Sequence, residues 1–157
     1  MLAYLFDERG RVLLLHRAKP PNFDLYSPIG GKLEQHLGES PTCCAIREIK
    51  EEADIDVRAE ELHLTGIVSE RSYEGQGHWL LFCYEVTHPV CVERTHMNEG
   101  TLEWHALDTV MDLAIPETDR KVLWPAFLQH RDGFFMVHID CTGPELTWSF
   151  EQAAGRR

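Results

Sequence analysis

The chain has 157 residues, of which 43% are hydrophobic, a length and composition typical of one soluble globular domain with a proper core. Its net charge of −11 argues against non-specific binding to DNA or RNA, because the phosphate backbones of nucleic acids would be repelled. A small phosphorylated ligand is compatible with this charge, provided that divalent cations lie between the carboxylates and the phosphates.

The sequence indicates neither a disulfide framework nor a membrane span. Its five cysteines are odd in number and no pair has C-x-x-C spacing, so we expect reduced, mostly buried thiols in a cytoplasmic protein. No apolar run approaches the length of a membrane-spanning helix. Charged residues interrupt the apolar start at Asp7, so we expect neither a signal peptide nor an anchor there.

The first part of the chain predicts a hairpin, a loop and a pair of glycines. Two short apolar runs, 2–6 and 11–16, flank the turn-like segment 7–10, a pattern typical of a β-hairpin. Residues 18–28 contain three prolines and predict a loop. The following Gly30-Gly31 pair allows backbone geometries that are closed to other residues.

A helix is predicted over residues 41–53. Ser40 is a good N-cap, and Pro41 fits the first helical position. One apolar arc of this helix carries four residues: Ala45, Ile46, Ile49 and Ala53.

The rest of the chain predicts strands mixed with two further helices. In chain order these elements are strands at 62–73 and 78–88 around a turn at 74–77, a strand at 101–107, helices at 108–114 and 117–130, and a closing hairpin of 133–140 and 146–150. Pro125 is expected to kink the last helix, and residues 153–157 are expected to fray. The pattern predicts an α/β fold with a mixed sheet and helices packed on its faces.

The segment 30–55, GGKLEQHLGESPTCCAIREIKEEADI, carries the chemistry of this sequence. Glu48, Glu51 and Glu52 stand at positions i, i+3 and i+4, so their carboxylates project from one face of the helix. Three like charges this close repel one another, but hard oxygen ligands so arranged suit Mg²⁺ or Mn²⁺. Arg47 lies beside them and could hold one carboxylate by paired hydrogen bonds. For E-x-x-E-E alone, a solvated acidic helix face is the better interpretation.

The wider segment resembles the Nudix box, G-x5-E-x7-R-E-U-x-E-E-x-G-U, in which U is a bulky aliphatic residue. Glu39, seven intervening residues and the run 47–52 match this spacing, and Ile55 fills the last aliphatic position. The chain is therefore identified as a member of the Nudix hydrolase (MutT-like) family. This resemblance implies a Nudix-type α/β/α sandwich.

The resemblance covers residues 2–115, and we expect one Nudix domain over residues 1–157. The helix and hairpin of 116–157 match no family feature. The box itself departs from the family pattern at two points. Seven residues separate Gly31 from Glu39 where the pattern has five, so a bulged loop is expected within 34–37, and Asp54 replaces a glycine in a position that favours left-handed backbone.

The resemblance also implies which residues would hold the metal. The Gly31 carbonyl and the carboxylates of Glu48, Glu51 and Glu52 are the expected ligands of Mg²⁺, for which Mn²⁺ could substitute. The stretch NEGTLEW, residues 98–104, resembles the place where MutT-like members carry a further metal-binding glutamate. Glu99 is the candidate for that ligand.

Glu103 is the reserve for that position. The expected catalytic residues are Glu48, Glu51 and Glu52 together with Arg47. Substrate contacts are expected from three residues: Arg17, which follows the strand VLLLH, Lys32 and Glu39. His36 lies in the inserted loop, where a solvent-facing role is the favoured interpretation. Four aromatic residues could stack on a base, although core packing is favoured for each: Phe23, Tyr26, Trp79 and Trp124.

The implied reaction is attack of water on a phosphorus in the diphosphate linkage of a nucleoside diphosphate derivative. Nucleoside triphosphates, nucleotide sugars and dinucleoside polyphosphates all fit this class. Glu48 and a loop glutamate both remain open as the general base. The small nucleotide substrate is the expected partner, with no DNA and no membrane. A homodimer is a further expectation, for which the C-terminal hairpin is the candidate surface.

Two other functions are compatible with the same family. An RNA 5′-end pyrophosphohydrolase would need a basic path for the strand, which 15 basic against 26 acidic residues disfavour. A catalytically weak Nudix-like module that senses a nucleotide or binds a partner would not need a crowded carboxylate cluster. The intact run 47–52 therefore favours an enzyme.

Overall fold

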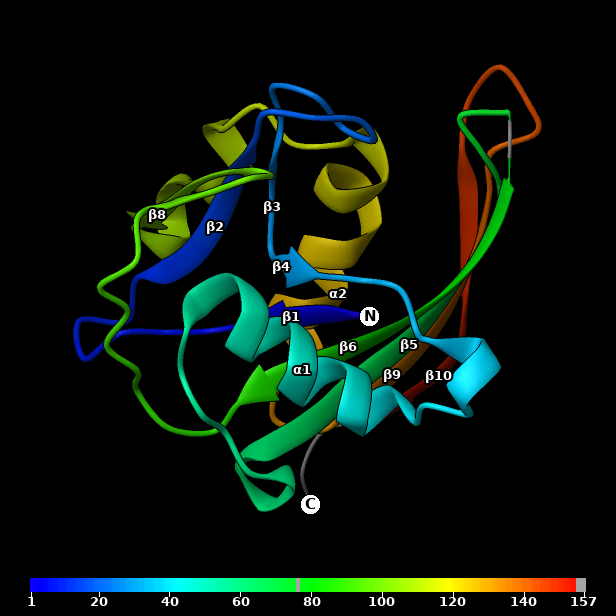
Figure 1. Cartoon of the computed structure of the whole chain (residues 1–157). Coiled ribbons are helices and arrows are strands. Elements are labelled where there is room, and N and C mark those ends of the chain that lie inside the picture. Colours follow the sequence, from blue (N-terminus) through cyan, green and yellow to red (C-terminus); the bar gives the residue numbers. More distant parts are fainter. Residues whose placement is uncertain (76, 155–157) are drawn as a thin grey trace. The chain divides into compact units, whose positions relative to one another are not determined.

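The computed structural model describes residues 1–75 and 77–154, and the chain forms two compact units (Figure 1). Unit 1 comprises Met1–His63 and Tyr84–Pro116. Unit 2 comprises Leu64–Cys83 and the chain from Glu117 onward. Among the helices described here, none is both long and apolar enough to cross a membrane. All five cysteines are free thiols, but the expectation that most of them are buried was wrong, because only Cys44 and Cys83 are buried.

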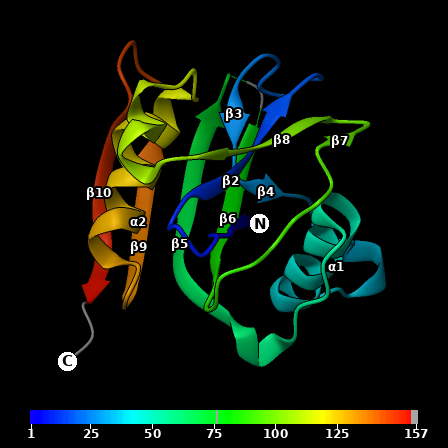
Figure 2. The ribbon, with the colours of Figure 1, turned by 90° about the vertical axis from the view of Figure 1, so that its left-hand side faces the viewer.

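Unit 1 contains a four-stranded antiparallel sheet in the order β3-β2-β8-β7 (Figure 2). Its longest ladder joins β2 to β8 over six residue pairs, from Val12↔His105 to Arg17↔Gly100. The first four residues of β2 are all buried apolar side chains. The bounds of the four strands are β2 Val12–Arg17, β3 Tyr26–Ser27, β7 His96–Met97 and β8 Gly100–His105.

The predicted N-terminal hairpin is only partly formed. The turn is present, since Asp7 N–H donates to Arg11 O and Gly10 N–H to Asp7 O. In the described residues the two predicted strands meet at an antiparallel bridge between Phe6 and Val12, but their ladders are made elsewhere: β1 (Leu2–Tyr4) pairs with β4 (Ile29–Gly30), whereas β2 pairs with β3 and β8. The ladder of β2 with β8 is longer than any that the short β1 could offer. Within the predicted loop 18–28, Tyr26–Ser27 forms β3.

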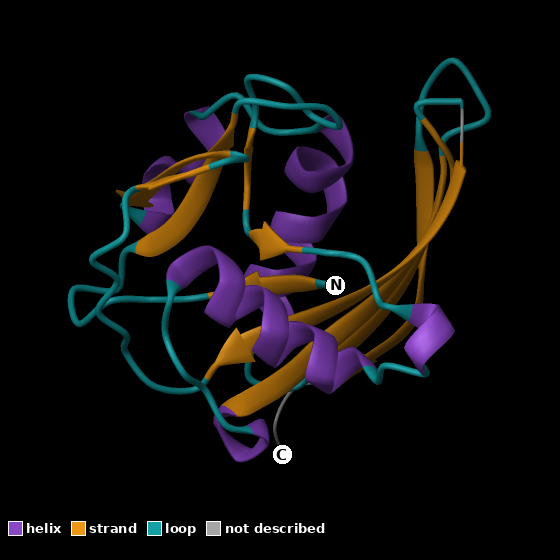
Figure 3. Ribbon diagram, viewed as in Figure 1, coloured by secondary structure: helices purple, strands orange, loops and turns teal. Residues whose placement is uncertain are grey.

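Helix α1, Pro41–Ala53, forms as the sequence predicts (Figure 3). The Ser40 hydroxyl accepts a hydrogen bond from Cys43 N–H at 3.1 Å, and this satisfies one of the free donors of the first turn. Asp54 ends the helix in the left-handed region, at φ 57°, and its N–H bonds to Lys50 O. The buried arc of α1 contains four small or apolar residues and one acid: Cys44, Ala45, Ile49, Ala53 and Glu52.

Unit 2 holds most of four strands that are neighbours in a mixed sheet, in the order β10-β9-β5-β6. Strands β5 and β9 run parallel, from Gly66↔Phe135 to Arg71↔Asp140, whereas β9 and β10 are antiparallel. The predicted mixed sheet is thereby confirmed. The strands are β5 Leu62–Tyr73, β6 Gly77–Val86, β9 Phe134–Asp140 and β10 Thr147–Ala154.

Two boundaries differ from the predictions for this part of the chain. Ala153 and Ala154 do not fray, because they pair with Phe135 and Phe134. The other residues of the predicted frayed end, 155–157, and Gln76 of the predicted turn lie outside the described residues. The short helix predicted at 108–114 is a 3-10 helix over Leu107–Asp112.

The helix predicted at 117–130 forms in two parts. A π-helical turn spans Asp119–Leu123, and α2 spans Trp124–His130 and packs against β9. Pro125 explains the change, because it has no N–H for the α-helical bond to residue 121. Trp124 N–H instead bonds to Asp119 O, five residues back. The π turn thus accommodates the proline.

Two carboxylic acids of unit 2 are buried close to each other. Glu70 on β5 is 5% exposed and Asp119 is 8% exposed. Burial raises the pKa of each to about 7, and the charge of Glu70 adds to the increase for Asp119. The Thr118 hydroxyl, a hydrogen-bond partner of both, only partly offsets this. The sequence patterns did not single out Glu70.

We expect Glu70→Gln to stabilise the protein at about pH 8 and to have little effect near pH 5. An acid whose pKa is raised by folding costs nothing while both states are protonated, and the cost grows between its unfolded and folded pKa, here between about 4.5 and 7. Removing it should gain roughly 2 kcal/mol at the higher pH, or roughly 4–8 °C in thermal midpoint. Thermal unfolding at both pH values measures this, with exposed Glu151→Gln as control. An equal gain at both pH values would contradict the interpretation.

Candidate active site

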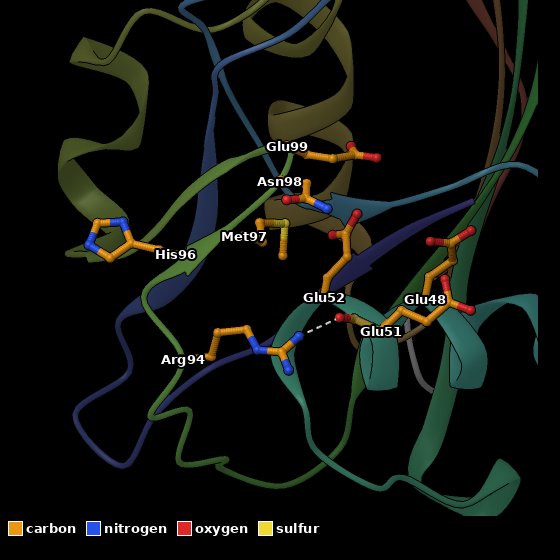
Figure 4. A pocket seen from close by; sticks show the side chains of 8 residues that line it. All are labelled: Glu48, Glu51, Glu52, Arg94, His96, Met97, Asn98 and Glu99. Carbon is orange, nitrogen blue, oxygen red and sulfur yellow. Dashed lines mark hydrogen bonds between the residues drawn. The ribbon is translucent and has the colours of Figure 1, made fainter.

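Three glutamates of α1 and the segment 94–99 line one open pocket of unit 1, with a volume of about 440 Å³ (Figure 4). The residues of the segment come from the connection before β7, from β7 itself and from the turn between β7 and β8. The lining residues are Glu48, Glu51, Glu52, Arg94, His96, Met97, Asn98 and Glu99. The structure therefore brings the three box glutamates together with Glu99, the predicted fourth metal ligand.

Glu52 is the most buried of these carboxylates, with an exposure of 6%. One hydrogen bond comes from the Gly30 N–H, but Oε2 is buried without a hydrogen-bond partner among the described residues. Burial, followed by the charges of Glu48 and Glu99, raises the pKa of Glu52 to about 8. A buried acceptor without a donor is costly, and a cation is one group that would satisfy it.

Arg47 holds the other two box glutamates. Its Nη1 donates to Glu48 Oε1 at 2.7 Å and lies 3.4 Å from Glu51 Oε2. Burial raises the pKa of Glu48, and Arg47 opposes this increase. Glu51 is open to solvent, with a side-chain exposure of 59%. The helix face therefore presents one buried, one half-buried and one exposed carboxylate.

The inserted loop is closed by Glu39. Arg47 Nε and Nη2 donate to its two oxygens at 2.8 and 2.9 Å, and Glu34 N–H donates to Oε2 at 2.8 Å. These hydrogen bonds lower the pKa of Glu39 to about 2. The expected bulge is confirmed as an exposed 3-10 turn, Gln35–Leu37, which contains His36. Glu39 does not line the pocket, and its substrate contact stays a prediction.

Gly31 lies directly against Glu48. A Cβ at this position would overlap the Glu48 carboxylate, so the absence of a side chain allows the loop and the helix to approach each other. The Gly31 carbonyl, a predicted metal ligand, accepts a hydrogen bond from the Met1 nitrogen at 2.6 Å. Gly31 is not among the residues that line the pocket.

The other predicted substrate contacts lie at the edge of this arrangement. Arg17 donates through Nε to Pro21 O at 2.7 Å, and its Nη2 lies 3.6 Å from Glu99 Oε2. Lys32 is exposed and its carbonyl accepts a hydrogen bond from Arg47 at 3.1 Å. Arg17 is thus next to a pocket carboxylate, and Lys32 contributes its backbone to the Arg47 network.

Glu103, the reserve for the fourth ligand, lies in a different cluster. Tyr26 OH donates to Glu103 Oε2 at 3.1 Å, and His105 Nε2 lies 3.3 Å from the same oxygen. Tyr26 stacks on His16 with ring centroids 4.4 Å apart. The structure therefore separates Glu103 from Glu99, although both stood in the same predicted stretch.

Two of the aromatic expectations are decided by burial. Trp124 is 1% exposed, which confirms core packing, whereas Phe23 is 65% exposed, so core packing was wrong for it. The pocket also contains four residues that the sequence patterns missed: Arg94, His96, Met97 and Asn98. Their proximity to Glu99 in the chain was the available signal.

The donor set of the pocket fits a divalent cation. Four carboxylates supply hard oxygens, and Glu52 Oε2 has no donor in the part of the chain that the structure describes. Over residues 1–75 and 77–154, no three His, Cys, Asp or Glu side chains converge as they stand on one metal position. Arg47 holds Glu48 and Glu51 instead, so these carboxylates would have to turn toward an ion.

The chain matches the NUDIX domain family over residues 1–124. The MutT protein from Bacillus halodurans is 27% identical, with a TM-score of 0.76 and coverage of 96% of this chain and 95% of that one. The MutT protein from Methanosarcina mazei Go1 is 20% identical (TM-score 0.70, coverage 83% and 91%). The NUDIX domain of Shewanella oneidensis NrtR, in complex with ADP ribose, is 19% identical (TM-score 0.67, coverage 82% and 84%). These last two show the fold alone. The resemblance of the segment 30–55 is thus confirmed, and the chain belongs to the NUDIX domain family.

Proposed function

We propose that this protein is a Mg²⁺-dependent hydrolase that cleaves the diphosphate linkage of a nucleoside diphosphate derivative by attack of water on phosphorus. The observation that supports it is the pocket in which Glu48, Glu51, Glu52 and Glu99 lie together. Within residues 1–75 and 77–154, the buried Glu52 Oε2 has no donor. Mn²⁺ would substitute for Mg²⁺, since both prefer oxygen ligands. We also propose that both units belong to one Nudix domain, which the 96% coverage in the comparison with the Bacillus halodurans protein supports.

Each residue of the site has a distinct part in this proposal. A bound divalent cation would neutralise the phosphate oxygens and make water a better nucleophile. The four pocket carboxylates and the Gly31 carbonyl would hold it. Arg47 fixes the orientation of Glu48 through the bond to Oε1. Glu48 and Glu99 are the two pocket carboxylates proposed to accept the proton of the attacking water.

The contacts to the substrate would come from the basic residues around the pocket. Arg17 lies beside Glu99 and would reach a phosphate that shares a cation with that carboxylate. Lys32 would add a positive charge from the loop after Gly31, and Glu39 would contribute by holding this loop. The exposed edge strand β10 remains the candidate surface for the predicted homodimer.

Product formation from a panel of substrates tests the proposal. The panel contains nucleoside triphosphates, nucleotide sugars, dinucleoside polyphosphates and ADP-ribose, each with Mg²⁺ and with EDTA. Turnover of one class that requires both the metal and Glu52 would establish the chemistry and the substrate group. No turnover of any class by the folded, metal-bound protein would overturn the proposal.

A nucleotide-sensing module is the second candidate, because the fold is similar to that of the NrtR domain in complex with ADP ribose. The retained carboxylates of α1 favour hydrolysis, since a pure binder does not need repelling charges. Calorimetric titration with ADP-ribose separates the two functions. Tight binding without metal-dependent turnover would identify the sensor.

We expect Glu99→Gln to reduce kcat/KM roughly 100-fold at limiting Mg²⁺, as a loss of about 3 kcal/mol of charge stabilisation would do. Glu103→Gln should leave activity within about twofold, because its carboxylate bonds to Tyr26 and does not line the pocket. Initial rates over a range of Mg²⁺ concentrations measure both variants. An equal loss in Glu103→Gln would show that the wrong carboxylate has been assigned.

A further inference from the structure

We propose that Arg94 is a positioning residue of the metal site, which ties the segment carrying Glu99 to the C-terminal turn of α1. The inference rests on the proposed function. Arg94 Nη1 donates to the Glu51 carbonyl oxygen at 2.6 Å (Figure 4). Its Nη2 lies 3.7 Å from Asp54 Oδ2. The same side chain lines the pocket that contains the four glutamates.

The Glu51 carbonyl is a suitable anchor because of its place in the helix. The last four carbonyls of a helix have no partner within it, and α1 ends at Ala53. The Asp54 N–H satisfies Lys50 O, one of these four, and Arg94 satisfies Glu51 O. A cation at this end is also favoured by the helix dipole. The contact is therefore a C-terminal cap contributed by a distant part of the chain.

The segment 90–99 is fixed at three further points. Val90 N–H donates to Phe6 O at 2.8 Å, β7 pairs with β8, and Glu99 O accepts from Ala18 N–H at 2.7 Å. These points attach the segment to the residue that follows β2, to β8 and to the chain before the Asp7 turn. Arg94 provides its attachment to the helix that carries the other three carboxylates. The three points fix the segment to the rest of unit 1, and Arg94 adds the tie that sets how closely residues 94–99 approach the helix with Glu48, Glu51 and Glu52.

The charge of Arg94 and its positioning role predict opposite effects on metal binding. A positive charge at the rim of the pocket repels a cation, so its removal by itself should tighten metal binding. Loss of the contact to Glu51 O should instead let residues 94–99, although still attached at the three other points, move away from α1 and so weaken binding. Residues that orient metal ligands typically contribute about 10- to 100-fold to metal affinity. The sign of the change therefore identifies the role.

Mn²⁺ binding without substrate, followed by electron paramagnetic resonance, is the test. Arg94→Met keeps an unbranched apolar stem and removes the donors, and we expect Mn²⁺ affinity to fall about 10-fold. Arg94→Lys keeps the charge and one donor group and should recover part of the loss. Arg58→Met, at a side chain that is 70% exposed, removes a charge elsewhere on unit 1 and should change nothing.

Two results for Arg94→Met would overturn the inference while the proposed function stands. Unchanged or tighter Mn²⁺ binding, with or without a lower thermal midpoint, would show that Arg94 only caps the helix or only adds charge. Unchanged Mn²⁺ binding with a raised KM would make it a substrate contact. By contrast, wild-type protein that binds no Mn²⁺, or Glu52→Gln that binds it normally, would overturn the proposed function itself.

Discussion

Glu52→Gln is expected to abolish turnover and, in the same protein, to stabilise the metal-free fold. Turnover should fall on the order of 1,000-fold or more, because a central carboxylate of the proposed metal site loses its charge without changing shape. The metal-free protein should gain stability because Glu52 is buried next to Glu48 and Glu99, and its Oε2 finds no donor among the residues described. Glutamine can still accept from Gly30 N–H, and its amide can donate toward the neighbouring carboxylates.

Thermal unfolding with EDTA and with Mg²⁺ separates these two effects. With EDTA, the midpoint of Glu52→Gln should lie roughly 4–8 °C above wild type, as a gain of roughly 2 kcal/mol implies for a chain of this size. Added Mg²⁺ should raise the midpoint of wild type, since ligand binding to the folded state stabilises it, and should not raise that of the variant. Exposed Glu60→Gln serves as control. A variant that keeps near-normal turnover would refute the assignment of Glu52.

The position of Glu52 on α1 explains why function and stability conflict there. Glu52 stands on the buried arc of the helix, between Ile49 and Ala53, where a globular fold alone would place an apolar residue. Glu51, one position earlier, is 59% exposed and adds little cost. The carboxylate at position 52 therefore destabilises the metal-free fold. A bound cation would reverse this destabilisation. Natural proteins carry such costs mainly where function requires them.

Local signals explain which elements of the fold could be predicted. The bounds of α1 follow from Ser40, Pro41 and Asp54, which act on the backbone within one turn. The pairing of β2 with β8 joins residues far apart in the chain, and the sequence of neither strand indicates which strand it pairs with. For the same reason the pairing of the short β1 with β4 was not predicted, and the expected hairpin forms as a bridge between Phe6 and Val12.

The candidate site shows the same contrast between what local signals predict and what depends on distant residues. Helical spacing places Glu48, Glu51 and Glu52 on one face, but it does not distinguish the buried carboxylate from the exposed one. The resemblance indicated Glu99, and the structure then separated it from Glu103. Arg94 could not be predicted, because it bonds to a backbone carbonyl and such a partner leaves no trace in the sequence.

Gly31→Ala is expected to reduce kcat about 100-fold with little change in stability, because misplacement of a reacting group by about 1 Å can cost that much. A Cβ at Gly31 would overlap the Glu48 carboxylate, the far end of a flexible side chain. Glu48 would swing away and lose its 2.7 Å bond to Arg47, while the backbone of α1 need not move. Steady-state rates and thermal midpoints measure the two effects, and Gly77→Ala is the matched control, since a Cβ there meets nothing closer than Trp79 Nε1 at 3.9 Å.

A double-mutant cycle shows whether the new methyl group acts through Glu48. If displacement of this carboxylate is the whole effect, adding Gly31→Ala to Glu48→Ala should cost almost nothing further, since the group that it displaces is already gone. If the losses of kcat in the two single variants multiply in the double variant instead, the methyl group does not act through Glu48. The affected group is then the Gly31 carbonyl, which is the metal ligand proposed in this loop. The first result assigns the effect of the methyl group to the helix carboxylate, and the second assigns it to the loop backbone.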